Sequence, residues 1–373
     1  MKRIRKNAFG FFRMMAVCLL LAACTDEDDF RRVEEGLPIS LRFSLTTPAP
    51  NEVTTRATDQ QETKVEKLAL FFYKTENDKP LVYQVPDVGT PAETTSTNYL
   101  YNIEVPESAG LTSGEWYLYA VANWDKGFWD KDMSIEGLAQ MTKSEMDNYC
   151  IQKKYKTLDI TETSILLTGK YGTSDGRVTL ERTESNEGVN ELQERIHLRR
   201  SIAKIIFNFK NGTGVTFTPE TYDLYNYCRT STLMERDGWT GGNLTDPGTL
   251  EWKGVNNDDN FTEGTDRPIL DGSFMFYMPE NVQKAKQSLT NKAMREKRDE
   301  NNYDNFTYAP ERGTYVVVHG KYEGPGEKSG ETVAADVKYT IFLGDFSDKG
   351  SADNFTVRRN TKYTFNVTVN GVK

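Results

Sequence analysis

Histidine and cysteine are scarce in this sequence, which limits the catalytic and metal chemistry that the chain can support. Its 373 residues include two histidines, His197 and His319, which lie far apart and each within a strand-like segment. No His-x-His, His-Glu-x-x-His or Cys-x-x-Cys spacing occurs, so the sequence does not indicate a zinc site. We therefore expect a protein that is not an enzyme and that requires no metal and no cofactor.

Long hydrophobic runs are also missing, and the mean hydropathy of −0.64 excludes a protein with several membrane-spanning helices. The apolar run at residues 14–23 is too short to cross a bilayer as a helix. The 13 residues that precede it include five basic residues and no acidic residue. This order of a basic start and a short apolar segment predicts a secretory signal peptide over residues 1–23.

A cysteine at the end of the apolar run gives the signal peptide a more specific meaning. Residues 21–24 read Leu-Ala-Ala-Cys, which resembles a bacterial lipobox. The resemblance implies cleavage between Ala23 and Cys24 and attachment of fatty acyl chains, such as palmitate, at Cys24. Stable anchoring takes more than one such chain. The alternative is an ordinary signal peptide with a chance cysteine.

Basic residues are outnumbered, and the formal net charge is −9. Without the first 23 residues, 41 basic residues face 55 acidic ones, so the chain should repel nucleic acid and anionic lipid surfaces. An acidic run at residues 26–29 follows Cys24 directly. It resembles the surface-export signal of Bacteroidota lipoproteins, and its alternative interpretation is a solvated spacer. We expect a lipid-anchored precursor at the outer membrane, exposed on the cell surface.

Strand patterns dominate the rest of the chain. Ile39, Leu41, Phe43 and Leu45 alternate with polar residues, which predicts a strand with one buried face. Further short strand patterns separated by glycine-rich turns favour β-sandwiches over a βαβ fold. A polar stretch at residues 184–191 predicts a boundary between two domains, at residues 57–187 and 188–373.

Several segments, taken in order, resemble the fimbrillin family of Bacteroidota, whose members are lipoprotein precursors of surface pili. The segments are the Cys24 lipobox, the strand at residues 39–45, Thr55-Arg56-Ala57 before the strand pattern that begins at Val65, and residues 196–205, 276–281, 313–318 and 357–367. The resemblance implies an all-β fold with minor helices, made of two tandem transthyretin-like Greek-key sandwiches. It is nearest to the minor or accessory members.

The family resemblance also implies how such a subunit matures. An arginine-specific protease would cut between Arg56 and Ala57 and remove residues 24–56 with the strand at residues 39–45. The apolar groove left behind could accept a strand from another pilus subunit. No spare alternating segment follows the last strand pattern, so we expect a tip or accessory position, although that last strand could itself be a donor.

Other interpretations stay open. A permanently lipid-anchored protein, either a pilus anchor or a glycan-binding lipoprotein, would keep Cys24; its sugar platforms would be Trp124, Trp129, Trp239 or Trp252. A host or glycan receptor is a further expected partner. Cys150 and Cys228 could form a disulfide or remain buried thiols, and the sequence does not decide between these states.

Overall fold

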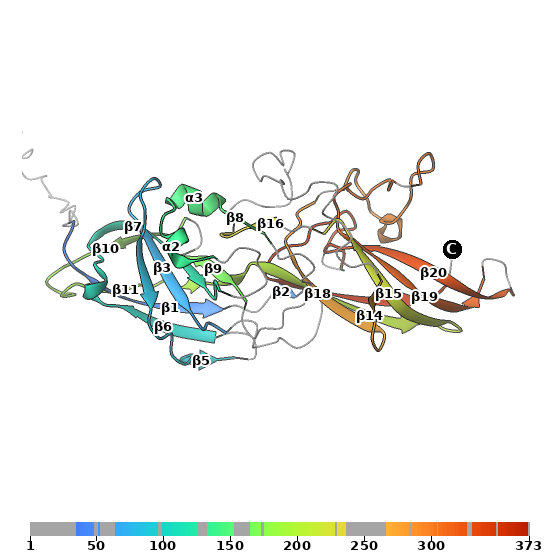
Figure 1. The fold of residues 1–373 in the computed structure, drawn as a ribbon, viewed down its shortest axis with the longest axis horizontal. Helices are drawn as coiled ribbons and strands as arrows, with labels where there is room; N and C mark the ends of the chain where they lie inside the picture. The colour runs from blue at the N-terminus through green and yellow to red at the C-terminus, as the bar shows by residue number, and fades with distance from the viewer. Residues whose placement is uncertain are drawn as a thin grey trace, which may run out of the picture.

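The computed structural model shows an elongated molecule in which two β-sandwiches lie end to end (Figure 1). None of the helices in the described part of the chain has the length and apolar character of a membrane span. The structure describes residues 35–47, 51–52, 64–95, 99–125, 133–152, 165–172, 175–227, 230–235, 266–283, 285–303, 305–326, 330–347 and 350–371.

The N-terminal sandwich consists of two facing sheets whose inner faces share one apolar core. One sheet has the order β11-β1-β6-β5, with β12 also paired to β1, and the other has the order β13-β9-β7-β3-β4, with β10 paired to β7. The strands are β1 (Ser40–Thr47), β3 (Leu68–Tyr73), β4 (Leu81–Val85), β5 (Glu93–Thr94), β6 (Tyr99–Val105), β7 (Gly114–Ala122), β9 (Leu167–Lys170), β10 (Arg177–Leu180), β11 (Val189–Glu191), β12 (Ile196–His197) and β13 (Arg199–Arg200).

Strand β3 explains why short helices cover one side of this sandwich. All six residues of β3 are buried, because Leu68, Leu70 and Phe72 face the sandwich core while the alternate residues face a second apolar cluster. Helices α2 (Ile135–Leu138) and α3 (Lys143–Asn148) supply part of that second cluster. Helix α3 begins with a capping box in which Thr142 and Glu145 bond reciprocally. A 3₁₀ turn, η2 (Glu107–Ala109), follows β6.

The C-terminal sandwich also has two facing sheets, with the orders β18-β14-β21-β2 and β17-β15-β19-β20. Aromatic side chains such as Phe207, Phe276 and Tyr363 fill its core. The strands are β2 (Asn51–Glu52), β14 (Ile202–Asn211), β15 (Thr216–Tyr225), β17 (Arg267–Pro268), β18 (Ser273–Pro279), β19 (Tyr315–Pro325), β20 (Thr332–Phe342) and β21 (Thr361–Val369). A 3₁₀ turn, η3 (Lys292–Met294), lies between β18 and β19.

The junction between the sandwiches is packed and hydrogen-bonded. Strand β8 (Cys150–Gln152) pairs antiparallel with β16 (Thr230–Thr232). Arg359, only 3 % exposed, forms an ion pair with Glu280 and donates to Ser231 Oγ at 2.9 Å and to Thr232 O at 2.7 Å. Because each donor of this buried cation has an acceptor nearby, the junction satisfies the charge that it buries.

The all-β sandwich class expected from the sequence is confirmed. The division between the sandwiches, however, lies later in the chain than the polar stretch at residues 184–191. Strands β11 and β12 pair with β1, and β13 pairs with β9, so all three belong to N-terminal sheets. Strand β14, which begins at Ile202, is the next strand in the chain and belongs to a C-terminal sheet. These pairings move the division to Ser201.

Candidate functional site: the first strand and its surroundings

Strand β1 lies inside its sheet and is paired along both edges. On one side, residues 41–47 pair antiparallel with residues 99–105 of β6. On the other side, residues 40–42 pair parallel with β11, and Leu45 and Thr46 pair with β12. Removal of β1 would therefore leave the ladder groups of two neighbouring edges unpaired.

The inner face of β1 is fully committed to the sandwich core. Leu41 and Leu45 are 0 % exposed and Phe43 is 5 % exposed, and Ile39, which directly precedes β1, is also 0 % exposed. All four belong to the core cluster that contains Leu70 and other side chains of the facing sheet. The four predicted strand residues thus lie together, on one face, where their loss would open an apolar groove.

The outer face of β1 is polar and carries a three-charge ladder. Arg42 lies between Glu104 on β6 and Glu191 on β11, at 3.5 Å and 3.9 Å between the paired N and O atoms. Two residues further along the same ladder, Ser44 Oγ donates to Asn102 Oδ1 at 3.2 Å. These side chains line a surface hollow of about 400 Å³ on the outer face.

The end of β1 is held by hydroxyl contacts. Thr47 is 0 % exposed, and its Oγ1 accepts a hydrogen bond from Tyr99 N at 3.1 Å. Thr46 Oγ1 and His197 Nδ1 are 2.9 Å apart. Partial burial and the nearby Arg199 and Arg195 lower the pKa of His197, which favours the neutral imidazole in this contact. His197 therefore acts as a sheet residue here.

Strand β2 extends the same segment into the other sandwich, a contact that sequence reasoning missed. Asn51 and Glu52 pair parallel with Thr361 and Lys362 of β21. The segment that precedes Arg56 thus contributes ladder bonds to both sandwiches. A strand of two residues has no periodicity, so no sequence signal could have revealed it.

The expected processing residues lie outside the described part of the chain. These residues are Ala23 and Cys24 at the lipobox and Arg56 and Ala57 at the expected cut. Cys228 also lies outside it, whereas Cys150 begins β8. Their processing, lipidation and pairing remain predictions.

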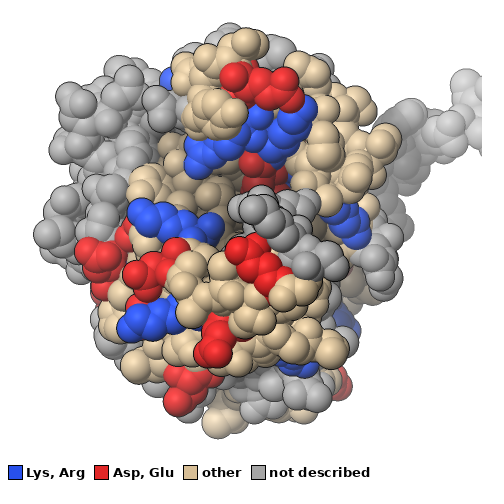
Figure 2. Space-filling model, turned by 90° about the vertical axis from the view of Figure 1, so that its right-hand side faces the viewer, with Lys and Arg blue, Asp and Glu red and all other residues tan. Residues whose placement is uncertain are grey.

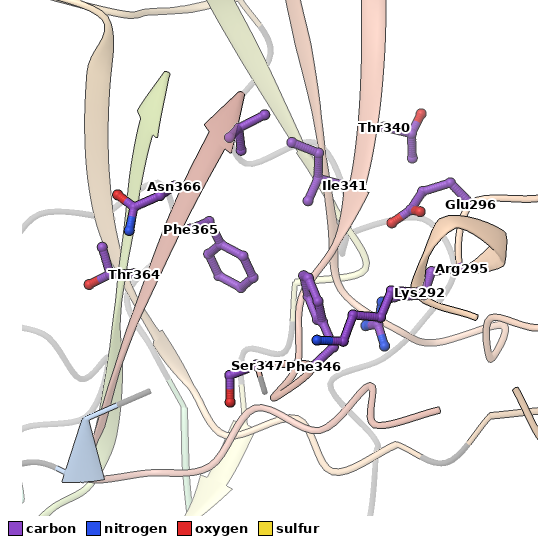
Figure 3. Close-up of a pocket in the computed structure, with 12 residues that line it drawn as sticks. Lys292, Arg295, Glu296, Thr340, Ile341, Phe346, Ser347, Thr364, Phe365 and Asn366 are labelled. Carbon is purple, nitrogen blue, oxygen red and sulfur yellow. The ribbon is translucent and has the colours of Figure 1, made fainter. Parts of the chain in front are cut away.

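A groove opens along one flank of the C-terminal sandwich, between the edge strands β20 and β21. Beyond its contact with β2, β21 has no described ladder partner on this side, and β20 pairs with β19 alone among the described strands. The groove has a volume of about 320 Å³. In Figure 3, Ile341 and Phe365 border it from opposite sheets.

Arg295 and Glu296 border the same groove, and Arg295 holds the covering loops in place. Arg295 is 1 % exposed and donates to the carbonyl oxygens of Ala352 at 2.6 Å and Leu343 at 3.0 Å. Its guanidinium lies 3.9 Å from the ring centre of Phe355. Burial lowers the pKa of Arg295 to about 10 and raises the pKa of Glu296. The surface at this end of the molecule carries interspersed basic and acidic side chains (Figure 2).

Other candidate sites gain little support from the described residues. Among the described residues, no group of three or more His, Cys, Asp or Glu side chains could bind a metal. The turn between β9 and β10 has the Gly-x-Ser-x-Gly spacing of serine hydrolases at residues 172–176, but it joins two strands instead of a strand and a helix. Trp124 is partly buried beside Lys67, and Trp129, Trp239 and Trp252 lie outside the described residues.

Comparison with known proteins gives one family and a set of solved structures. Residues 276–367, which run from β18 into β21, match a family described as a domain of unknown function, DUF4906. No curated protein matches the chain. The similar structures include fimbrial proteins, putative cell adhesion proteins and a putative polysaccharide binding protein. The structures named next are described as pilus components and not as enzymes.

The tip fimbrial protein Mfa3 from Porphyromonas gingivalis, with a C-terminal truncation, is 14 % identical at a TM-score of 0.48 over 88 % of this chain and 95 % of that chain. A fimbrial assembly protein from Parabacteroides distasonis is 11 % identical, with a TM-score of 0.44, and the match covers 90 % of this chain and 93 % of that chain. The fimbrial anchor protein Mfa2 from P. gingivalis is 8 % identical, with a TM-score of 0.32, and the match covers 88 % of this chain and 90 % of that chain.

Proposed function

We propose that this chain is a structural and adhesive subunit of a surface pilus, assembled by strand exchange after cleavage between Arg56 and Ala57. The observation that carries the proposal is the position of β1. A strand that is paired on both edges and that, together with Ile39 just before it, supplies four core residues precedes the expected cut. Its departure would leave a slot shaped for another strand.

The energetics favour refilling of such a slot. Reburying four large apolar side chains is worth roughly 6–12 kcal/mol before the cost of ordering the incoming strand. New ladder bonds on both edges would add to this, because unpaired strand edges are templates for pairing. The proposed partner is a strand of another pilus subunit. The proposed precursor is lipid-anchored at Cys24 and exposed on the outer membrane, and the proposed position is at the tip or as an accessory subunit.

The N-terminal sequence of the protein recovered from the cell surface tests this proposal. We expect a start at Ala57 in the assembled form and SDS-resistant ladders of larger species. An Arg56→Ala variant should start at Cys24 and should not form ladders. Arg32→Ala is the matched control, because Arg32 lies in the same segment but a cut after it would leave β1 in place. Wild-type protein that always starts at Cys24 would overturn the proposal.

A permanently tethered subunit is the second candidate, and the intact fold favours it directly. The uncut chain already has a complete N-terminal sandwich, with β1 in its slot and β2 on the other sandwich. Such a protein would keep its lipid and act as a pilus anchor or as a surface glycan-binding lipoprotein. Mass spectrometry that finds acylated Cys24 on the full-length surface protein, with no ladders, would select this function.

A further inference from the structure

We propose that the slot left by β1 favours a replacement strand with a basic side chain at the position of Arg42 and discriminates against one with an acidic side chain there. This inference rests on the proposed exchange of β1 and adds the chemistry by which the slot would select its partner. It follows from the carboxylates of Glu104 and Glu191, which lie on either side of the slot at the same position along the strand. The occupant is an extended strand of another subunit, with a cation at its centre.

The register of the sheet places both carboxylates directly across from Arg42. Arg42 pairs with Glu104 in the antiparallel ladder and with Glu191 in the parallel ladder. Side chains directly opposite one another on adjacent strands lie on the same face and interact. Among the described residues, Arg42 is the basic group in ion-pair contact with Glu104 and with Glu191. Loss of β1 would therefore leave two uncompensated carboxylates, one on β6 and one on β11.

An incoming strand then meets a charge filter. A Lys or Arg at the central position restores both ion pairs, whereas a neutral residue restores neither. An Asp or Glu there would stand between two like charges, and such repulsion discriminates against wrong partners. The acidic balance of the accepting chain, which has 37 basic and 48 acidic residues from Ala57 on, adds to this selection.

The rest of β1 completes the profile of the accepted strand. Apolar residues occupy positions 39, 41, 43 and 45, and the serines at positions 40 and 44 alternate with them. This seven-residue pattern is symmetric about Arg42, so the central cation meets the same level of the slot whichever way the strand runs. The last strand of this chain, at residues 363–369, has the same apolar alternation but Asn366 at its centre. It should therefore be a weaker donor than a strand with a central cation.

The size of the effect follows from exposure. The three side chains are 53–71 % exposed, so each ion pair contributes little by itself and is screened by salt. Replacement of the cation by an acid changes two attractions into two repulsions. We expect binding to weaken a few-fold for a neutral residue and about tenfold or more for an acid, mainly at low ionic strength.

A strand-replacement assay tests the inference. The chain cut after Arg56 would be mixed with fluorescent peptides of residues 37–47, and the affinity measured by anisotropy at low and high salt. The wild-type and Arg42→Lys peptides should bind alike, and the Arg42→Glu peptide about tenfold or more weakly. The Ser44→Glu peptide is the positional control, because it introduces a carboxylate opposite Asn102 while it keeps Arg42, and it should lose less affinity.

Charge reversal in the protein gives the second arm. In the Glu104→Lys/Glu191→Lys double variant, which changes two exposed side chains, the preference should switch towards the Arg42→Glu peptide. Equal binding of the wild-type and Arg42→Glu peptides to the unmodified protein would overturn the charge filter and leave strand exchange standing. Failure of every peptide, the wild type included, would overturn the exchange of β1 and the filter with it.

Discussion

The two sandwiches differ in how completely their cores are enclosed. In the N-terminal sandwich, β1 lies between β6 and β11, and its apolar side chains are at most 5 % exposed. In the C-terminal sandwich, no described strand beyond the two residues of β2 lies on the flank between β20 and β21, and the inward side chains Val337 and Ile341 are only partly buried. The C-terminal flank thus indicates what the N-terminal sandwich would resemble without β1: a core with a groove along it.

The segment that holds β1 also connects the two regions. Through β2 it pairs with the end of β21, at the edge that borders the C-terminal groove. Removal of residues 24–56 would therefore open the N-terminal core and lengthen the free edge of β21 in one step. Both sandwiches would then have an apolar groove beside an unpaired strand edge.

The largest expected effect concerns the junction that keeps both sandwiches in register. Arg359→Ala should lower the free energy of unfolding by about 3–5 kcal/mol, because it leaves the carboxylate of Glu280 buried without a compensating cation. The double variant Arg359→Met/Glu280→Leu should recover most of this loss. Urea unfolding followed by tryptophan fluorescence measures both. A single variant as stable as the wild type would show that the ion pair does not hold the junction.

The second prediction compares the closed and open cores directly. Leu41→Ala should cost about 2–5 kcal/mol, because the side chain is fully buried and its cavity is enclosed. Ile341→Ala at the open groove should cost about 1 kcal/mol, since the side chain is partly exposed to solvent before the change. Denaturant unfolding of both variants checks the difference, and equal losses would mean that the groove is closed in solution.

The third prediction uses pH to distinguish the groove from the rest of the molecule. Burial raises the pKa of Glu296, so the folded state holds its proton to higher pH than the unfolded state does. Its contribution to stability is therefore present below the ordinary glutamate pKa and is lost as pH rises through the raised one. Glu296→Gln should raise the melting temperature by a few degrees at neutral pH and by little at pH 4. A gain independent of pH would argue against a buried carboxylate.

Sequence alone located the first strand and its buried face, and little of what surrounds that strand. Strict alternation identified β1 and its buried face, because a strand with one buried face imposes a period of two. It missed β11 as a neighbour of β1, since Val189–Glu191 pairs through its backbone and shows no apolar pattern. For the same reason it placed the domain division too early. The C-terminal groove was also invisible, because distant strands and loops line it only after folding.

The smallest expected effect concerns Arg42 and separates selection from stability. In the intact chain, Arg42→Ala should change the free energy of unfolding by less than about 1 kcal/mol, because its two ion pairs are exposed and screened. A larger loss would make Arg42 a structural residue and would weaken the case for a charge filter. A small loss in the free energy of unfolding would mean that β1 depends on its apolar face for stability. Arg42 would then serve mainly to match the carboxylates of Glu104 and Glu191, which would select a replacement strand. The closed sandwich would then differ from the open one in selectivity as well as in enclosure.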